Sequence, residues 1–453
     1  MIPPRYGFQN KAIKHIHYHG VTYLMCGMSM GKTRVCIDAN RTIPYPMFVL
    51  APKFAALDTW GKEIQKWDED RKFVVLHGKD KEFLWAESDE YTTIIMNYDG
   101  LPWFYKIVQQ QLRPLQKYHF VFDEASMLKA HNTNRALILN NMTPIMSPYK
   151  TALSGTPAPQ SLVDLWHQYY LLDGGKALTP EFYQFRNRYF DFDPKTYSTT
   201  IKDGAAKHIY DAIAPITIRL KAEDYLDLPE VMINDIKLKL PYKLRRMYEK
   251  FEEEFILEFP TAASVAVSSA ALESKLRQFL QGAVYTEQLT GPRRRGVQQI
   301  HTIKAQVLKE IVATSAGQPI LAATQFKFER EIYEKVLGKK IATIDGSTSG
   351  SRGKMLIDRW NKGLIPLLLV HPKSVAYSLN LQEGGHRILF LGLPWELDLY
   401  QQLIARLVRV GQRSNRVIVD RLIFKNTKDE KVATYLRRKN ATQEGLFNAV
   451  TTK

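Results

Sequence analysis

The chain has 453 residues, of which 45% are hydrophobic and 24% are charged, ordinary values for a globular protein with room for two cores. No apolar run reaches membrane-spanning length and no N-terminal signal pattern is present, so we expect the protein to stay in the compartment where it is made. The two cysteines, Cys26 and Cys36, are too few for a disulfide framework and lack metal-ligand spacing.

The charge balance of 63 Lys+Arg against 46 Asp+Glu gives a formal net charge of +17. A field of that size attracts polyanions and speeds their capture, which favours nucleic acid as a partner. A well-solvated basic surface explains the same charge equally well, so charge alone leaves both interpretations open.

In the first third of the chain, short apolar runs alternate with amphipathic stretches such as Thr59–Trp67, whose apolar residues recur at helical spacing. Strands separated by helices predict parallel βαβ units. The predicted strands are Val21–Cys26, Met47–Ala51, Phe73–Leu76, Thr93–Met96, His119–Phe122 and Lys150–Leu153.

From about Ser161 to Thr302 the pattern changes and predicts mainly helices, with few strands. Arg245–Phe259 is predicted as a charged helix and Leu272–Leu280 as another. A basic loop flanked by glycine and proline follows at Gly291–Gln299.

The strand and helix alternation returns in the last third, with helices expected at Lys327–Leu337 and Gly353–Asn361. The predicted fold class is therefore α/β, with two parallel-sheet halves and a helical insertion between the core motifs. The predicted strands are Pro319–Ala323, Lys340–Ile344, Leu367–Val370, Arg387–Leu391 and Arg416–Leu422.

A glycine-containing segment follows the strand Val21–Cys26 and opens a helix, which is the context of a phosphate-binding loop. Backbone N–H groups of such a loop converge on phosphate oxygens at the positive end of the helix dipole. Lys32 would reach the β- and γ-phosphates, and Thr33 would offer a hydroxyl ligand to Mg²⁺. A chance match in an ordinary loop is the alternative. The segment comprises Gly27, Met28, Ser29, Met30, Gly31, Lys32 and Thr33.

Two acidic residues, Asp123 and Glu124, follow the predicted strand His119–Phe122. Ligands of parallel sheets bind at the carboxyl ends of the strands, where these acids fall. Asp123 is predicted to hold Mg²⁺ and Glu124 to orient and deprotonate an attacking water. Taken alone, such a pair is usually solvated; with the phosphate-binding loop upstream, the catalytic interpretation is favoured.

A third strand end, Leu153–Pro157, carries the hydroxyl residues Ser154 and Thr156. These hydroxyls could couple the nucleotide site to a nucleic-acid track, although an ordinary turn is the alternative. Far along the chain, Arg406 and Arg409 are three residues apart, which predicts that both project from one face of a helix. Two such arginines suit a phosphate that gains charge in a transition state, whereas a solvated basic helix face is the other interpretation.

These stretches, in this order and over nearly the whole chain, resemble the Swi/Snf-type DNA translocases of helicase superfamily 2 in a compact phage or bacterial form. The most specific likeness is the spacing QxxxRxxRxGQ, which fits Gln402, Arg406, Arg409, Gly411 and Gln412. The chain departs from the family pattern at Ser126, where histidine is usual, and at Ala376–Tyr377, where a glycine pair is usual.

The resemblance implies two RecA-like lobes, with an ATP-binding lobe at 1–222, a lobe junction and helical protrusion at 223–302 and a C-terminal helicase lobe at 303–453. It implies that Gln9 reads adenine and that the segment of Lys53, Trp60 and Trp67 grips the nucleic-acid backbone. It also implies that Gln402, together with Ser154 and Thr156, couples the nucleotide site to the nucleic-acid track. For the basic loop residues, phosphate contact and plain solvation are equally open. These are Arg293, Arg294 and Arg295.

The expected function is an ATP- and Mg²⁺-dependent translocase on double-stranded or branched DNA, which remodels or branch-migrates DNA in replication, recombination or repair. A strand-separating DNA or RNA helicase is one alternative, and single-stranded nucleic acid or RNA therefore remains open as a partner. An ATP-gated nucleic-acid-binding switch with negligible turnover is the other. The expected location is the cytoplasm of a bacterial or phage-infected cell.

Overall fold

The computed structural model describes residues 4–27, 30–111, 114–158, 161–193, 198–254, 256–259, 262–265, 268–288, 295–348, 350–375 and 380–449. Contacts divide the chain into two compact units. Unit 1 comprises Met1–Asp227 and Lys439–Lys453, and unit 2 comprises Leu228–Arg438. The division of the chain at 222 and 302 stays a prediction.

Unit 1 is built on a seven-stranded sheet of order β3-β4-β2-β5-β6-β1-β9, in which every described pairing is parallel. Its strands read as apolar runs because both faces of a parallel sheet are covered. They are β1 (Val21–Cys26), β2 (Met47–Ala51), β3 (Phe73–Val75), β4 (Thr93–Asn97), β5 (His119–Asp123), β6 (Lys150–Ser154) and β9 (Thr217–Leu220).

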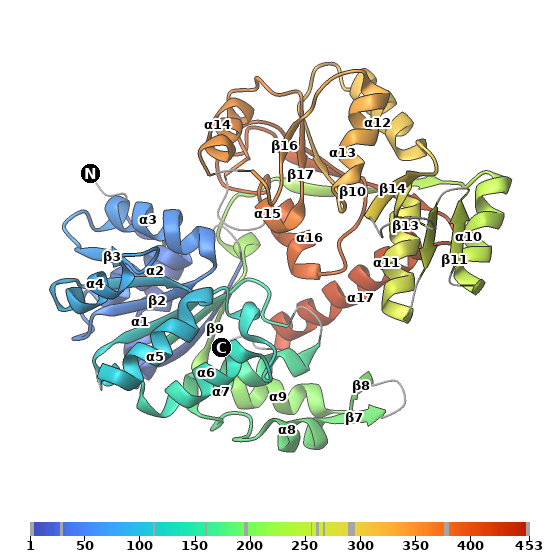
Figure 1. Cartoon of the computed structure of the whole chain (residues 1–453). Coiled ribbons are helices and arrows are strands. Elements are labelled where there is room, and N and C mark those ends of the chain that lie inside the picture. The colour runs from blue at the N-terminus through green and yellow to red at the C-terminus, as the bar shows by residue number, and fades with distance from the viewer. Residues whose placement is uncertain are drawn as a thin grey trace. The chain divides into compact units, whose positions relative to one another are not determined.

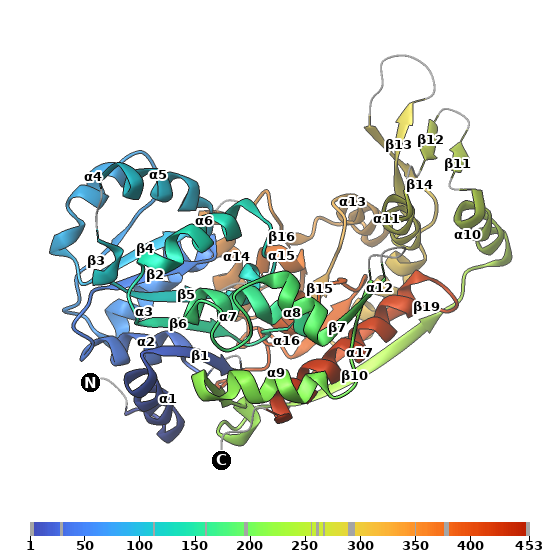
Figure 2. The same ribbon diagram turned by 90° about the horizontal axis from the view of Figure 1, so that it is seen from below.

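Helices cover both faces of this sheet, and in both views α2 and α5 lie on opposite sides of it (Figure 1, Figure 2). A small hairpin, β7 (Phe190–Asp193) with β8 (Ser198–Ile201), follows α8. The helices are α1 (Gly7–His19), α2 (Lys32–Asn40), α3 (Trp60–Trp67), α4 (Lys81–Ala86), α5 (Leu101–Gln111), α6 (Asn134–Met142), α7 (Leu165–Asp173), α8 (Phe182–Tyr189) and α9 (Ala205–Ile213).

Unit 2 contains a six-stranded sheet of order β10-β19-β18-β15-β17-β16, again with every described pairing parallel. Its strands are β10 (Glu230–Leu238), β15 (Ile320–Ala323), β16 (Ala342–Ile344), β17 (Leu367–Val370), β18 (Arg387–Phe390) and β19 (Arg416–Phe424). Its helices are α12 (Ile303–Thr314), α13 (Phe328–Leu337), α14 (Gly350–Asn361), α15 (Pro372–Val375), α16 (Leu397–Ile404) and the start of α17 (Lys428–Ala449). The predicted α/β fold class with two parallel sheets is confirmed.

The expectation of a mainly helical middle is wrong. Besides α10 (Tyr242–Glu254) and α11 (Ser269–Leu280), this part holds a four-stranded antiparallel sheet (Figure 2). The helix expected at Arg245–Phe259 ends at Glu254, and the apolar run behind it is a strand. Periodicity cannot tell a short apolar run of a strand from one of a helix, which explains the error. The four strands are β11 (Ile256–Phe259), β12 (Ala262–Val265), β13 (Ala283–Gln288) and β14 (Arg295–Gln299).

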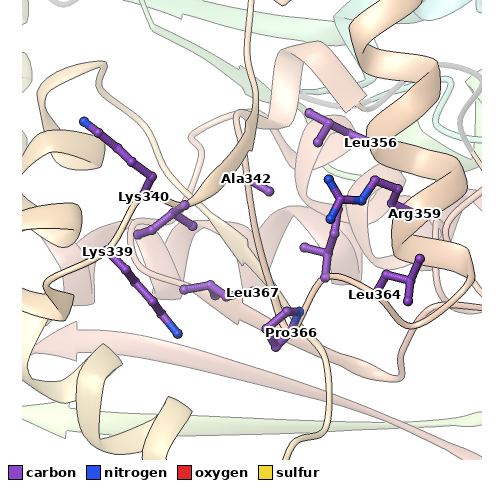
Figure 3. A pocket seen from close by; sticks show the side chains of 10 residues that line it. Lys339, Lys340, Ala342, Leu356, Arg359, Leu364, Pro366 and Leu367 are labelled. Carbon is purple, nitrogen blue, oxygen red and sulfur yellow. The ribbon is translucent and has the colours of Figure 1, made fainter.

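A hollow in unit 2 lies at the amino ends of β16 and β17, with Lys339 and Lys340 on one side and Arg359 on the other (Figure 3). Lys340 pairs with Glu334 at 2.8 Å. The carboxyl ends of the strands lie at the opposite edge of the sheet. This hollow is therefore remote from the segments that follow the strands.

We expect the stability of the protein to depend on pH through Glu329, which is fully buried in α13. Burial raises its pKa from 4.5 to about 7, although Phe326 N and the Tyr333 hydroxyl donate to it at 2.7 and 2.8 Å. The folded state holds the proton of Glu329 up to a higher pH than the unfolded state does, so this carboxyl lowers the free energy of unfolding as pH rises from about 4.5 to about 7. The free energy of unfolding falls by about 3 kcal/mol over this range.

Urea unfolding of wild type and Glu329→Gln at pH 5 and pH 8 measures this effect. The variant should gain stability relative to wild type at pH 8, and much less at pH 5. Glu331→Gln, an exposed change on the same helix, is the control and should show no such difference. An equal effect of Glu329→Gln at both pH values would contradict the prediction.

Candidate active site

Three of the predicted motifs follow three neighbouring strands of unit 1. The order β5-β6-β1 places the ends of these strands side by side. Since the strands are parallel, the segments that follow them emerge at one edge of the sheet. The phosphate-binding loop follows β1, the acid pair ends β5, and the hydroxyl segment ends β6. The structure therefore brings Lys32, Asp123 and Ser154 to a common edge.

The phosphate-binding loop ends at Gly31, which caps α2 in the left-handed conformation with φ 68° and ψ 39°. The left-handed conformation favours glycine, and a Cβ atom there would lie 2.6 Å from Gln9 Nε2, which would have to move. Lys32 Nζ donates to the carbonyl oxygens of Cys26 and Gly27 at 3.1 and 3.3 Å, so its side chain lies over the loop. Lys32 and Thr33 form the first turn of α2, whose free N–H groups suit an anion. Met28 and Ser29 lie outside the described residues.

Asp123 is held from three directions. Its Oδ2 accepts from Trp60 Nε1 at 2.9 Å and its Oδ1 from the backbone N–H of Glu124 at 3.0 Å. Its carbonyl oxygen accepts from the Tyr98 hydroxyl at 2.7 Å. Burial raises the pKa of Asp123, and the Trp60 bond and the Lys32 charge oppose that shift. The carboxylate of Asp123 and the hydroxyl of Thr33 are oxygen ligands of the kind Mg²⁺ prefers.

Glu124 has φ 50° and ψ 56°, a left-handed conformation that is costly for a residue with a Cβ atom. Such strain costs about 1–3 kcal/mol and persists only where its surroundings enforce it. Ser126, at the position where the family usually has histidine, is buried in a short 3-10 helix, Ala125–Leu128.

A magnesium ion usually takes one or two carboxylates together with substrate phosphates and waters. The described residues contain no cluster of three or more His, Cys, Asp or Glu side chains that could hold a metal ion.

The hydroxyl segment after β6 is tied into a buried polar network. Ser154 Oγ accepts from Thr156 N at 3.0 Å, while the Thr156 hydroxyl finds no hydrogen-bond partner within the described part of the chain. Gln168 of α7 donates to the carbonyl oxygen of Pro157 at 2.8 Å and accepts from the Tyr23 hydroxyl at 2.5 Å. Since Tyr23 belongs to β1, this network links the strand that precedes the phosphate-binding loop to the hydroxyl segment.

Gln9 lies beside the phosphate-binding loop, and its role in reading adenine stays a prediction. It is 3% exposed, accepts from the Tyr6 N–H at 3.1 Å and donates to the carbonyl oxygen of Met30 at 3.4 Å. Next to it, Tyr6 stacks on Phe8 at a centroid distance of 5.3 Å, and Phe8 contacts Tyr225 at 5.0 Å. Tyr6 and Tyr225 are 51% and 41% exposed, so aromatic surface is available near Gln9.

The arginine motif belongs to unit 2, and the expectation that both arginines share one helix face is wrong. Helix α16 ends at Ile404, and tighter i→i+3 bonds such as Arg406 N–H to Leu403 O at 3.1 Å follow it. The Nε groups of Arg406 and Arg409 donate to the carbonyl oxygens of Gln402 and Ala405 at 3.1 and 3.0 Å, two acceptors that a continuing helix would use.

Asn380 and Gln402 lie close to this motif. Arg409 also donates to the Asn380 side chain. Gln402 is 1% exposed, and neither atom of its amide group meets a partner among the residues that the structure describes. A buried amide without partners is costly, so Gln402 does not contribute to stability through its amide bonds to the described residues.

The predicted nucleic-acid contacts have mixed outcomes. Lys53 is exposed directly after β2. Trp60, expected in the same gripping segment, is only 1% exposed and serves Asp123 instead, and Trp67 donates to Glu63 at 2.6 Å. Arg293 and Arg294 lie outside the described residues, and Arg295 begins β14.

Sequence reasoning missed Trp60, Tyr98 and Tyr225 as parts of the site. A buried tyrosine usually finds a partner for its hydroxyl, so a tyrosine directly after β4 was a usable signal for Tyr98. Nothing in the sequence pattern indicated Tyr225, because it lies on an irregular segment that follows β9. No helix of the described residues is both long and apolar enough to cross a membrane.

Comparison with known proteins agrees with this geometry. A family model described as "SNF2-related domain" matches residues 11–290, and one described as "Helicase conserved C-terminal domain" matches residues 303–411. A phage protein of the Acyrthosiphon pisum secondary endosymbiont phage 1, called "Putative protein p41", is 31% identical over 467 residues, with 98% of each chain covered.

Longer relatives match at lower identity. An uncharacterized ATP-dependent helicase of Mycoplasma genitalium is 24% identical, with 91% of this chain and 39% of that protein covered. The ISWI chromatin-remodeling complex ATPase of Saccharomyces cerevisiae is 23% identical, with 89% of this chain and 37% of that protein covered. The chain thus spans about two fifths of these two relatives. The solved SWI2/SNF2 ATPase core of Sulfolobus solfataricus in complex with dsDNA is 20% identical, with a TM-score of 0.44 and coverage of 99% of this chain and 94% of that chain.

The SNF2-related model covers more than half of the chain, and the phage relative matches nearly end to end. The chain therefore belongs to the SNF2-related family of helicase superfamily 2, and it is a helicase-like ATPase.

Proposed function

We propose that the protein is an ATP-dependent double-stranded DNA translocase that remodels or branch-migrates DNA in replication, recombination or repair. The observation that carries the proposal is the order β5-β6-β1, which sets the phosphate-binding loop, the acid pair and the hydroxyl segment at one sheet edge. The net charge of +17 supports a polyanionic track. The phage relative supports action in the cytoplasm of a bacterial or phage-infected cell.

In the proposed mechanism, Gln9 recognises the adenine of ATP, and the backbone from Gly27 to Thr33 cradles the phosphates. Lys32 exchanges its hydrogen bonds to the carbonyl oxygens of Cys26 and Gly27 for contacts with the β- and γ-phosphates of ATP. Thr33 and Asp123 hold Mg²⁺, which neutralises charge on the phosphates when it is bound.

Glu124 accepts the proton of the water that attacks the γ-phosphorus, while the bond from that phosphorus to the bridging oxygen of ADP breaks. Arg406 and Arg409 stabilise the charge of the transition state, as the family spacing implies. Ser154, Thr156 and Gln402 couple this cycle to movement along DNA. Their support is the buried network at Ser154 and the polar groups of Thr156 and Gln402, which have no hydrogen-bond partner among the described residues.

Lys53, Arg293, Arg294 and Arg295 are proposed to contact the DNA backbone. Contacts to phosphates carry no sequence information, so we expect weak sequence preference and a strong dependence on salt.

ATP hydrolysis by wild type, Lys32→Ala and Glu124→Gln tests the catalytic assignment. Duplex or branched DNA should stimulate wild type strongly, and each variant should lose at least about a hundredfold in kcat. Glu124→Gln should still bind ATP, because only the base is removed. Glu82→Gln, at an exposed acid in α4, is the matched control. Stimulation by single strands or RNA alone would favour a strand-separating helicase, and no turnover with any nucleic acid would favour the switch.

Arg406→Ala and Arg409→Ala should each lower kcat by about a thousandfold, with little change in the KM for ATP, because their charge acts in the transition state. Arg413→Ala, which removes an exposed arginine just beyond the motif, should leave kcat unchanged. Steady-state kinetics with saturating duplex DNA provide both constants. A rise in KM without loss of kcat would assign the arginines to ground-state binding instead.

Displacement of a third strand from a duplex distinguishes translocation from strand separation. We expect ATP-dependent release of the third strand while the duplex stays intact. The logarithm of the DNA-binding constant should fall linearly with the logarithm of the salt concentration, with a slope of roughly −0.9 per neutralised phosphate. Lys53→Ala should weaken duplex binding on all sequences alike and make that slope shallower by about one. Separation of the duplex itself would contradict the translocase proposal.

A further inference from the structure

Two aromatic side chains hold opposite ends of Asp123, one at its carboxylate and one at its carbonyl oxygen. We infer that Trp60 and Tyr98 are positioning residues with separate tasks: Trp60 orients the Asp123 carboxylate toward Mg²⁺, and Tyr98 fixes the peptide that aims Glu124. This inference rests on the proposed function, because it takes Asp123 as the magnesium ligand and Glu124 as the base.

Trp60 is the first residue of α3 and only 1% exposed, and its indole N–H donates to Asp123 Oδ2 at 2.9 Å. Asp123 Oδ1 accepts from the backbone N–H of Glu124 at 3.0 Å. Each carboxylate oxygen thus has one donor, and an ionised carboxylate offers about four acceptor sites. The two bonds fix the plane of the carboxylate and leave acceptor sites for a cation.

The rest of α3 keeps Trp60 in place. A Cβ atom on Gly61 would lie 3.1 Å from the ring of Phe73, so the helix packs tightly against β3 at this point. Ile64, one turn after Trp60, is fully buried. Because a buried indole N–H without a partner is costly, Trp60 and Asp123 stabilise each other's orientation.

Tyr98 lies directly after β4, is 2% exposed and donates its hydroxyl to the carbonyl oxygen of Asp123 at 2.7 Å. Arg135 lies over its ring at 5.1 Å and donates to Asp99 at 3.2 Å, which braces the tyrosine. The carbonyl that Tyr98 binds belongs to the peptide that joins Asp123 to Glu124. That peptide leads into the left-handed conformation of Glu124, with φ 50°. A hydrogen bond to the carbonyl resists rotation of the peptide and so preserves the direction of the Glu124 side chain.

The two tasks predict opposite patterns in two variants. Mn²⁺, detected by electron paramagnetic resonance, serves as the probe for the metal site in the full-length protein with a non-hydrolysable ATP analogue. Trp60→Phe should weaken Mn²⁺ binding by about tenfold, as removal of a hydrogen-bond partner of a metal ligand typically does. Its kcat should return toward the wild-type value at saturating Mg²⁺.

Tyr98→Phe removes one hydroxyl and keeps the ring. It should leave Mn²⁺ binding unchanged and lower kcat by about tenfold or more at every Mg²⁺ concentration, because the base is misplaced. Trp103→Phe is the control, since its indole N–H donates to Glu82 at 3.1 Å and not to Asp123. It should change neither quantity.

A tryptophan analogue with sulfur in place of the indole nitrogen, incorporated at position 60, keeps the shape and removes only the donor. It should reproduce the Mn²⁺ effect of Trp60→Phe even if that variant folds poorly. Wild-type Mn²⁺ affinity with the analogue, or weakened Mn²⁺ binding in Tyr98→Phe, would overturn the inference. Asp123→Asn separates this failure from that of the proposed function: if Asp123→Asn retains wild-type Mn²⁺ affinity, Asp123 is not the metal ligand, and the proposed site itself is wrong.

Discussion

Parallel pairing is the constraint on which the rest of the molecule depends. Because parallel strands all point the same way, the segments that follow them lie at one edge of the sheet. The strand order β5-β6-β1-β9 decides which of these segments are neighbours. The phosphate-binding loop after β1 is flanked by the segment after β6 on one side and by the chain that leaves β9 on the other. Residues more than a hundred positions apart in sequence thus meet at this edge. The helices on both faces of the sheet exclude water from the strands and make the parallel arrangement stable.

Gathering polar groups at this edge has an energetic cost, and three departures from ordinary protein geometry lie there. Burial raises the pKa of Asp123, Glu124 adopts a left-handed backbone, and Thr156 keeps a hydroxyl without a partner among the described residues. In unit 2, the buried amide of Gln402 is the corresponding feature. Local violations of this kind are tolerated where function requires them, and the surrounding core offsets their cost.

The strands were predictable from sequence because a strand covered on both faces reads as an unbroken apolar run. Val21–Cys26 and Met47–Ala51 were predicted to the residue, and the segments that follow them came with recognisable chemistry. The errors have physical causes. Ile256–Phe259 is too short for its period to distinguish a strand from a helix, and Arg406 and Arg409 lie beyond a helix end set by local i→i+3 bonds. The role of Trp60 depends on a hydrogen bond across the sheet edge to Asp123, which is 63 residues away in sequence.

The contact between the phosphate-binding loop and the end of β9 has a mechanical consequence. Gly27 donates its N–H to Leu220 O at 3.1 Å, and a Cβ atom on Gly27 would lie 3.0 Å from the Cβ atom of Ala222. Asp227, where the chain leaves unit 1, is five positions after Ala222. Any side chain at position 27 would press on the backbone at Ala222, so the close contact between the phosphate-binding loop and the segment after β9 depends on glycine at this position.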